Sequence, residues 1–203
     1  MKRESIPVGW RSRGYLPHFD SRCVVQHVTY RLADSLPADV VAQIEAALKV
    51  VPSDRQQVER RMRIEDWIDR GLGSCLLGEP AAARMVQQSF LHFDGERYRL
   101  LAWLVMPNHV HVLFHTLGEW TMSRIVASWK SYTGRRLSLG PPRSSVALPR
   151  HRVWHREYWD RFIRDELHFQ VAREYIHQNP VKAGLVRRVE DWEWSSARRS
   201  GGG

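Results

Sequence analysis

Two apolar segments separated by a Pro-Asn step are the feature that most limits how this chain of 203 residues can fold. They are "RYRLLAWLVM" at 97–106 and "HVHVLFHTL" at 109–117. Each has the length and composition of a strand, and the Pro-Asn step favours a turn. A link this short joins antiparallel neighbours. The sequence therefore predicts a β-hairpin.

The chain on either side of the hairpin is predicted to form helices and two further strand-like segments. Strands are expected at 23–32 and within 152–165, and helices at 38–50, 53–70, 79–93, 121–137 and 166–178. Strands that alternate with helices, together with one hairpin, indicate an α+β sheet covered by helices.

Two of the predicted helix boundaries rest on specific residues. Ser53 followed by Gln56 has the form of a capping box, which predicts that a helix starts there. Asn179 and Pro180 are expected to end the last helix, because proline lacks the N–H that continues a helix.

Size and composition favour a single domain that works in the cytoplasm. The longest apolar run, at 100–106, is too short to cross a bilayer, so no membrane partner is expected. Cys23 and Cys75 are the only cysteines, which excludes a disulfide framework and a four-cysteine zinc site.

The chain is strongly basic, with 31 Lys and Arg against 22 Asp and Glu, a formal net charge of +9 and a pI near 10.1. Only four of the basic residues are lysine. The planar fork of arginine matches phosphate oxygens, and a basic surface attracts polyanions. Nucleic acid is the expected partner, although a GC-rich genome also produces arginine bias and composition does not separate the two.

His109 and His111 share one face of the second hairpin strand, because side chains two apart in a strand point the same way. Val110 then faces the opposite side, into a core. Two neighbouring imidazoles on a stiff strand suit a metal ion. The alternative is a pair of histidines that is satisfied by hydrogen bonds.

Tyr175 and Asn179 are four residues apart in the last predicted helix, so they meet on one face, with Gln178 beside them. A phenol and a carboxamide oxygen can serve as a nucleophile and a third metal ligand. Imidazole with carboxamide oxygen suits Mg²⁺ or Mn²⁺ in an open site. A half-buried structural tyrosine is the alternative.

The paired motifs "MPNHVHVLFH" and "EYIHQNPVKAGLV", in this order, resemble those of the HUH single-tyrosine transposases. The blocks "VWHREYWDRFIRDELHF" and "DWEWSS" are similar to the branch called REP-associated tyrosine transposases, which carry an IS200-like transposase domain. The resemblance covers the first strand and residues 98–196, and it is weak over 37–93.

The resemblance implies a ferredoxin-like antiparallel central sheet, with helices packed on one side of it and extra helices inserted after the first strand. The expected organisation is a basic arm at 1–20, a transposase domain at 21–196 with a helical insertion at 37–93, and a flexible tail at 197–203.

The resemblance also implies a reaction. His109 and His111 would bind Mg²⁺ or Mn²⁺, Asn179 or Gln178 would be the third ligand, and Tyr175 would be the nucleophile. The tyrosine would attack single-stranded DNA at a hairpin or palindromic repeat and give a 5′-phosphotyrosine and a free 3′-OH, which later rejoins strands. A monomer is favoured over a homodimer.

The residues expected to grip DNA phosphates flank this site in the sequence and are Arg135, Arg136, Arg150, Arg152 and Lys182. Trp154 and Trp159 are candidates for stacking on unpaired bases. Two other functions stay open. One is a hydrolase whose metal activates water, and the other is a domesticated DNA-binding protein that does not cut.

Overall fold

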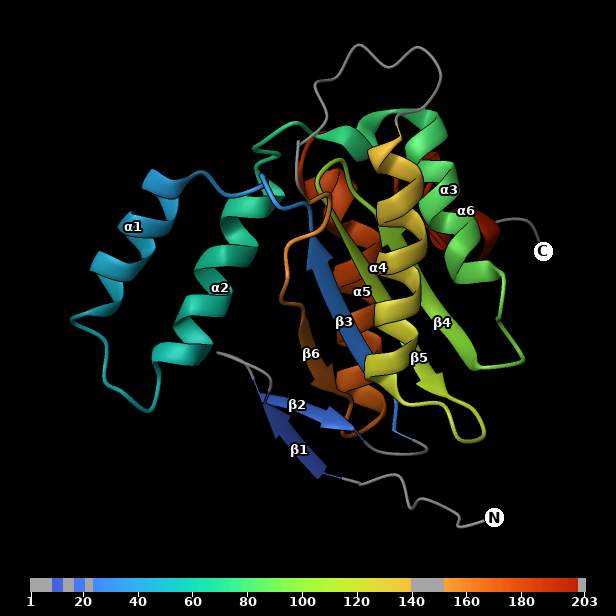
Figure 1. The fold of residues 1–203 in the computed structure, drawn as a ribbon, viewed down its shortest axis with the longest axis horizontal. Helices are drawn as coiled ribbons and strands as arrows, with labels where there is room; N and C mark the ends of the chain where they lie inside the picture. Colours follow the sequence, from blue (N-terminus) through green and yellow to red (C-terminus); the bar gives the residue numbers. More distant parts are fainter. Residues whose placement is uncertain (1–8, 13–16, 21–23, 140–151, 201–203) are drawn as a thin grey trace.

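The computed structural model describes residues 9–12, 17–20, 24–139 and 152–200, and it centres on a four-stranded antiparallel sheet (Figure 1). Its strands are β3 (Gln26–Arg31), β4 (Tyr98–Val105), β5 (His109–Thr116) and β6 (Trp159–Phe162), in the spatial order β4-β5-β3-β6. The first sheet strand thus lies between the third and the fourth, which is the ferredoxin-like order. The predicted fold class is confirmed.

The predicted hairpin is formed by β4 and β5, which pair on either side of Pro107 and Asn108. The other strands are shorter than predicted. The expected strand at 23–32 is regular only over β3, and the strand-like segment at 152–165 only over β6. On its other side β5 pairs with β3.

Helices cover both faces of the sheet. The helices α3 (Pro80–Leu91) and α4 (Met122–Ser138) pack on one face, where Val110, Val112 and Phe114 point. The helix α5 (Glu166–Lys182) packs on the other face, and its Ile176 joins Leu113 in a second apolar cluster. The expectation of helices on one side is therefore wrong for α5, because both faces of β5 carry apolar residues to be buried.

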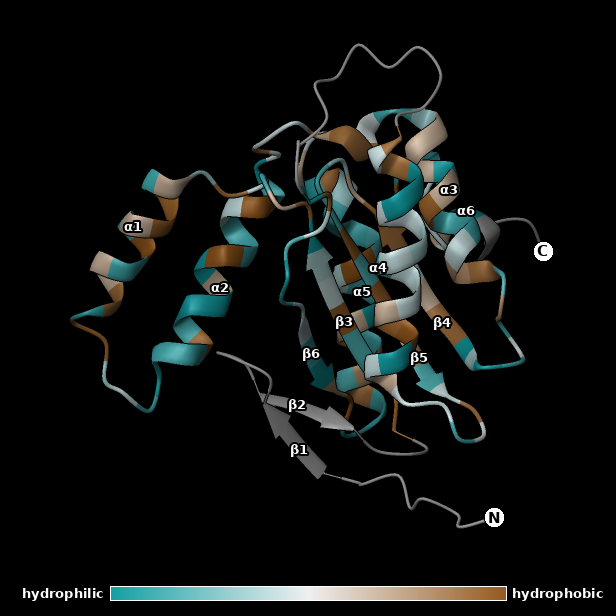
Figure 2. Ribbon diagram, viewed as in Figure 1, coloured by the Kyte–Doolittle hydropathy of each residue, from teal (hydrophilic) through white to brown (hydrophobic). Residues whose placement is uncertain are grey.

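Two helices stand apart from the sheet (Figure 1). They are α1 (Ala38–Leu48) and α2 (Gln56–Asp69), and α1 turns its apolar side toward α2 (Figure 2). Val40, Ile44 and Leu48 form a separate cluster there with Ile68. Within the insertion expected at 37–93, this pair of helices is the part that leaves the sheet, whereas α3 packs on it after the short 3-10 turn η1 (Leu76–Gly78).

The predicted capping box at the start of α2 does not form. The helix begins at Gln56 with Arg55 at the N-cap position and no side-chain cap. The Gln56 side chain donates instead to the Leu48 and Val51 carbonyls, at 3.3 and 3.0 Å, and so ties the end of α1 to the start of α2.

The predicted end of α5 at Asn179 and Pro180 is also wrong, because the helix continues to Lys182 with Pro180 inside it. Pro180 falls in the last turn, so its missing N–H removes a single helical hydrogen bond. The Ala183 N–H then bonds to the Asn179 carbonyl at 2.9 Å and closes the helix.

The chain ends carry further regular structure. In the expected N-terminal arm, β1 (Gly9–Ser12) and β2 (Pro17–Asp20) pair as a two-stranded sheet. The 3-10 turn η2 (Val189–Asp191) follows α5, and α6 (Ala197–Ser200) forms a short helix. Ala197, the first residue of the expected tail, is buried, and its N–H donates to Ser195 Oγ at 3.1 Å.

Gly73 is expected to be the least replaceable glycine of the loop after α2. Its φ is +86°, and a Cβ would lie 2.5 Å from the Asp34 backbone oxygen. Gly73→Ala should lower the free energy of unfolding by about 2–3 kcal/mol, because a backbone clash adds to left-handed strain. Gly71→Ala is the control, since Gly71 has φ +71° and open space around it. Its expected loss is about 1 kcal/mol. Equal losses in urea unfolding would contradict the steric argument.

Candidate metal centre and tyrosine site

His109 and His111 lie side by side under α5, as their spacing on one strand predicts. Both side chains are fully buried, and their Nε2 atoms are 3.0 Å apart. Burial, followed by the neighbouring His109 and His27, lowers the pKa of His111 well below 6.5. His111 is therefore neutral at physiological pH, which is the form that binds metals.

Asn108 fixes the proton on His109. Its Nδ2 donates to the Ile68 and Leu72 carbonyls at 2.9 and 3.0 Å, so its Oδ1 faces His109 Nδ1 at 2.7 Å. A carboxamide oxygen only accepts, so Nδ1 carries the hydrogen and the Nε2 lone pair is left free. His111 Nδ1 lies 2.9 Å from the Thr29 hydroxyl and 3.2 Å from His27 Nε2, so Nε2 is the ring nitrogen that faces His109.

Asp69, the last residue of α2, completes a group of three possible ligands. Its Oδ1 lies 3.3 Å from His109 Nε2, and one ligand atom from each of Asp69, His109 and His111 falls within 4.8 Å of the others. Ligands on one ion at about 2.1 Å are separated by about 3 Å when they meet at right angles. The separations of His109 Nε2 from His111 Nε2, 3.0 Å, and from Asp69 Oδ1, 3.3 Å, are close to this value. The sequence alone gave no reason to select Asp69.

Asn179 is the fourth polar group at this point. Its Nδ2 lies 3.3 Å from Asp69 Oδ1 and 3.4 Å from His111 Nε2. The residue is 1% exposed, and its Oδ1 has no hydrogen-bond partner among the described residues. A 180° rotation about the last side-chain bond exchanges the amide O and N. It would turn an oxygen toward His111, so the residues present fit a divalent cation.

Tyr175 approaches the histidines from α5. Its ring centroid lies 5.5 Å from that of His111 and 6.2 Å from that of His27. Burial raises the pKa of Tyr175 above 10, with Asp69 and Glu65 adding to the effect, and the cations of Arg61 and Arg161 oppose it. The resting side chain is therefore a neutral phenol.

Of the predicted DNA-binding residues that the structure describes, Lys182 approaches the tyrosine, with its Nζ 5.4 Å from the Tyr175 ring centroid. Arg135 and Arg152 line an open pocket at the end of α4, which packs on the other face of the sheet. Arg136 is exposed on the same helix, and Arg150 lies outside the described residues.

Trp154 and Trp159 are 4% and 7% exposed, so the suggestion that they stack on unpaired bases is wrong for this structure. The Trp154 ring packs edge-on against Tyr30 and its Nε1 donates to the Thr133 hydroxyl at 2.9 Å.

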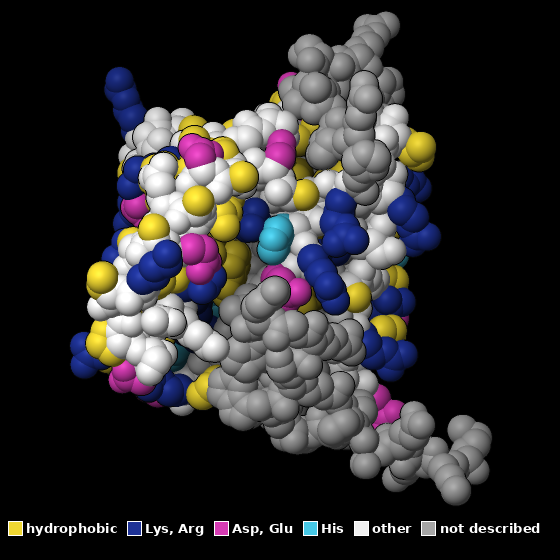
Figure 3. Space-filling view, turned by 60° about the vertical axis from the view of Figure 1, so that its left-hand side comes forward, with side chains coloured by type: hydrophobic (Ala, Val, Ile, Leu, Met, Phe, Trp, Pro, Cys, Tyr) yellow, Lys and Arg dark blue, Asp and Glu magenta, His cyan; other side chains and the backbone are white. Residues whose placement is uncertain are grey.

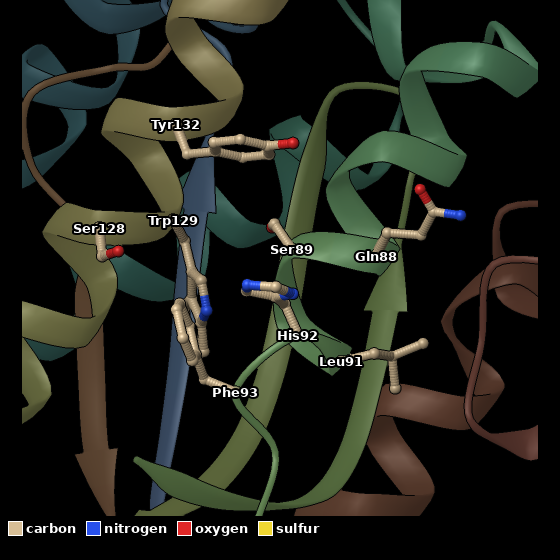
Figure 4. A pocket seen from close by; sticks show the side chains of 8 residues that line it. All are labelled: Gln88, Ser89, Leu91, His92, Phe93, Ser128, Trp129 and Tyr132. Atoms are coloured by element: carbon tan, nitrogen blue, oxygen red, sulfur yellow. The ribbon is translucent and has the colours of Figure 1, made fainter. Parts of the chain in front are cut away.

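A cavity of about 560 Å³ lies between α3 and α4, on the face opposite the histidines (Figure 4). The described residues that line it are Gln88, Ser89, Leu91, His92, Phe93, Ser128, Trp129 and Tyr132. This lining holds no carboxylate and no lysine or arginine, so it offers neither a metal-ligand set nor a phosphate grip.

Residues 84–179 match the sequence model of the family described as "Transposase IS200 like". The match to the IS200-like transposase family thus covers just under half of the chain. The matched segment contains both histidines, Tyr175 and Asn179, whereas Asp69 precedes it. The resemblance seen in the motifs is confirmed.

The chain is similar to two curated relatives. A protein of Haemophilus influenzae assigned to the REP-associated tyrosine transposases is 29% identical over 106 residues, which are 50% of this chain and 60% of that protein. The REP-associated tyrosine transposase of Escherichia coli is 24% identical over 121 residues, which are 57% of this chain and 65% of that protein. The matches thus span less than two thirds of either relative.

Among solved structures, that of a REP-associated tyrosine transposase bound to a REP hairpin has a TM-score of 0.57 with this chain. The two are 17% identical, and the match covers 92% of this chain and 84% of the other. This similarity shows a shared fold. Across the described residues, no helix combines the length and apolar character needed to span a membrane.

Stability is expected to fall in acid because of His27, which is 4% exposed. Burial, followed by Arg61 and Arg161, lowers the pKa of His27 from 6.5 to about 3. Between these two pKa values His27 is protonated in the unfolded chain and neutral in the folded chain, so the free energy of unfolding decreases as pH falls. The contribution is about 1.4 kcal/mol per pH unit between about pH 6 and pH 4. His27→Gln should remove it in urea unfolding with a chelator present, and an unchanged slope would refute the assignment.

Proposed function

We propose that this chain is a metal-dependent DNA strand transferase that cleaves and rejoins single-stranded DNA at hairpin or palindromic repeats through a 5′-phosphotyrosine. The observation that carries the proposal is the approach of the Tyr175 ring to within 5.5 Å of the buried His111 ring. Helix α5 would thereby place the nucleophile next to metal ligands of strand β5.

His109, His111 and Asp69 would hold Mg²⁺ or Mn²⁺, and Asn179 would add its amide oxygen. Gln178 is less suited to this role, because its side chain forms an exposed hydrogen bond on α5, where its Nε2 donates to Glu174 at 2.8 Å. When bound, the cation polarises a phosphate and stabilises the charge that develops on it.

Tyr175 Oη would form a bond to the phosphorus of a phosphodiester while the bond from phosphorus to O3′ breaks. The phenol loses its proton and the departing oxygen gains one, so the products are a 5′-phosphotyrosine and a free 3′-OH. Attack of a 3′-OH on the tyrosine ester reverses the step and joins strands. Lys182, near the Tyr175 ring, would favour the phenolate and the substrate phosphate.

Three features support a hairpin DNA partner and a monomer. The chain carries a formal net charge of +9, and the relative with the shared fold is bound to a hairpin. In addition, Tyr175 reaches the histidines within one chain, so a second copy is not required to assemble the site.

Wild-type protein with Mn²⁺ is expected to form a covalent adduct with a labelled single-stranded hairpin from the flanks of its own gene. The label should run with the protein in denaturing electrophoresis, and Tyr175→Phe should abolish that band because the nucleophile is lost. Cleavage by wild type with no adduct would indicate a hydrolase, and binding without cleavage would indicate a DNA-binding protein that does not cut.

The metal-binding role of His111 is tested by comparing it with His115, a second histidine on the same strand. His111→Ala should abolish the adduct while the hairpin is still bound. His115→Ala should keep the adduct, since His115 lies farther along the strand and contacts the Thr116 carbonyl.

Asp69→Asn is expected to weaken Mn²⁺ binding by at least about tenfold, because it removes a charged ligand and keeps the side-chain shape. Titration calorimetry on metal-free protein measures this without DNA. Asp66→Asn is the matched control on the same helix, where Asp66 forms an exposed ion pair with Arg70. Equal affinities of the two variants would exclude Asp69 as a ligand.

A further inference from the structure

A small cavity of about 130 Å³ opens beside Tyr175, and neither His109 nor His111 lines it. Its lining comes from α2, β3, β6 and α5, and comprises His27, Arg61, Glu65, Arg161, His168, Val171, Ala172 and Tyr175. The side of the molecule drawn in Figure 3 carries several Lys and Arg side chains, with a smaller number of Asp and Glu among them.

Three elements direct basic side chains into this cavity. Arg161 is paired with His27 across β6 and β3, so both point to the face that α5 covers. Arg61 comes from α2, outside the sheet, and His168 from the first turns of α5. Basic groups that converge from separate elements are a common arrangement for anion recognition.

The cavity holds more positive than negative charge. Arg61 Nε donates to Glu65 Oε1 at 2.8 Å, and these two side chains are only 16% and 17% exposed. No carboxylate of the described residues forms an ion pair with Arg161. The charge of Arg61 is therefore balanced by its ion pair with Glu65, whereas Arg161 has no ion pair among the described residues. Burial, followed by repulsion from Arg61, lowers the pKa of Arg161, which agrees with two cations facing each other.

We infer that Arg161 and Arg61 clamp a backbone phosphate of the DNA strand that Tyr175 attacks. This rests on the proposed function, and it adds a strand-positioning site that is separate from the metal centre. A phosphodiester carries one negative charge, which matches the uncompensated guanidinium. The clamp would hold the strand while the tyrosine ester exists, since it uses neither the nucleophile nor the candidate ligands.

The test uses the full chain carrying Tyr175→Phe, in a chelator, so that binding is measured without cleavage. Arg161→Gln is compared with Arg99→Gln, because Arg99 is an exposed arginine of the opposite edge strand, β4. The probe is the labelled hairpin with its single-stranded flank, titrated by fluorescence anisotropy at several salt concentrations. Inorganic phosphate serves as a competitor.

Arg161→Gln is expected to weaken binding by about 5–10-fold and to reduce the slope of log K against log salt by about 0.7, the value of one lost contact to a single strand. Arg99→Gln should leave both unchanged. Millimolar inorganic phosphate should compete weakly, because the strand supplies further contacts. Equal salt slopes in the two variants would overturn the clamp, and so would full displacement of the strand by inorganic phosphate.

Neutral methylphosphonate linkages, introduced one at a time in the flank, locate the phosphate. A neutral linkage at one position should weaken hairpin binding by the protein that keeps Arg161 and should not weaken binding by the Arg161→Gln variant any further. Additive losses at every position would overturn the clamp even if the wild type forms its adduct. Failure to form the adduct, with the Arg161 dependence intact, would instead overturn the proposed chemistry and leave the clamp standing.

Discussion

The buried carboxamide of Asn108 is the contact on which the geometry of the site depends. Its Nδ2 donates to two backbone carbonyls at the end of α2, and its Oδ1 accepts a hydrogen bond from His109 Nδ1. Its own backbone carbonyl accepts from the Leu32 N–H at 2.8 Å, just beyond β3. One residue thus connects the outlying helix pair, the central strand and its neighbour. Removing it would leave several buried polar groups unpaired, at about 1–3 kcal/mol each.

The two faces of the sheet differ in the residues that they bury. One face of β5 packs under α3 and α4 in an apolar core, and the other turns its imidazoles toward α5. The ring of Tyr175 meets them there between opposing charges, since Asp69 and Glu65 disfavour the phenolate and Arg61 and Arg161 favour it. The electrostatic balance at the Tyr175 phenol is therefore set by charged residues of α2 and β6, and not by the helix α5 that carries Tyr175.

Local periodicity was enough to predict the hairpin, the shared face of His109 and His111, and the placement of Tyr175 beside Asn179. These depend on spacing within one element. Asp69 and Arg61 were missed because their positions depend on how α2 docks, and docking leaves no periodic signal in the chain. The same limit explains Gln56, whose side chain bonds across to α1, and Trp154, whose burial is decided by its partners. The roles proposed for the site residues remain predictions, whereas the family match of residues 84–179 and the fold are established.

The three residues that converge on one point, Asp69, His109 and His111, belong to α2 and β5, and none belongs to α5. A displacement of α5 would carry Tyr175 and Asn179 away and leave that trio intact. Under the proposed function, a DNA strand joined to Tyr175 would move with α5, while Asp69, His109 and His111 would keep their arrangement on α2 and β5.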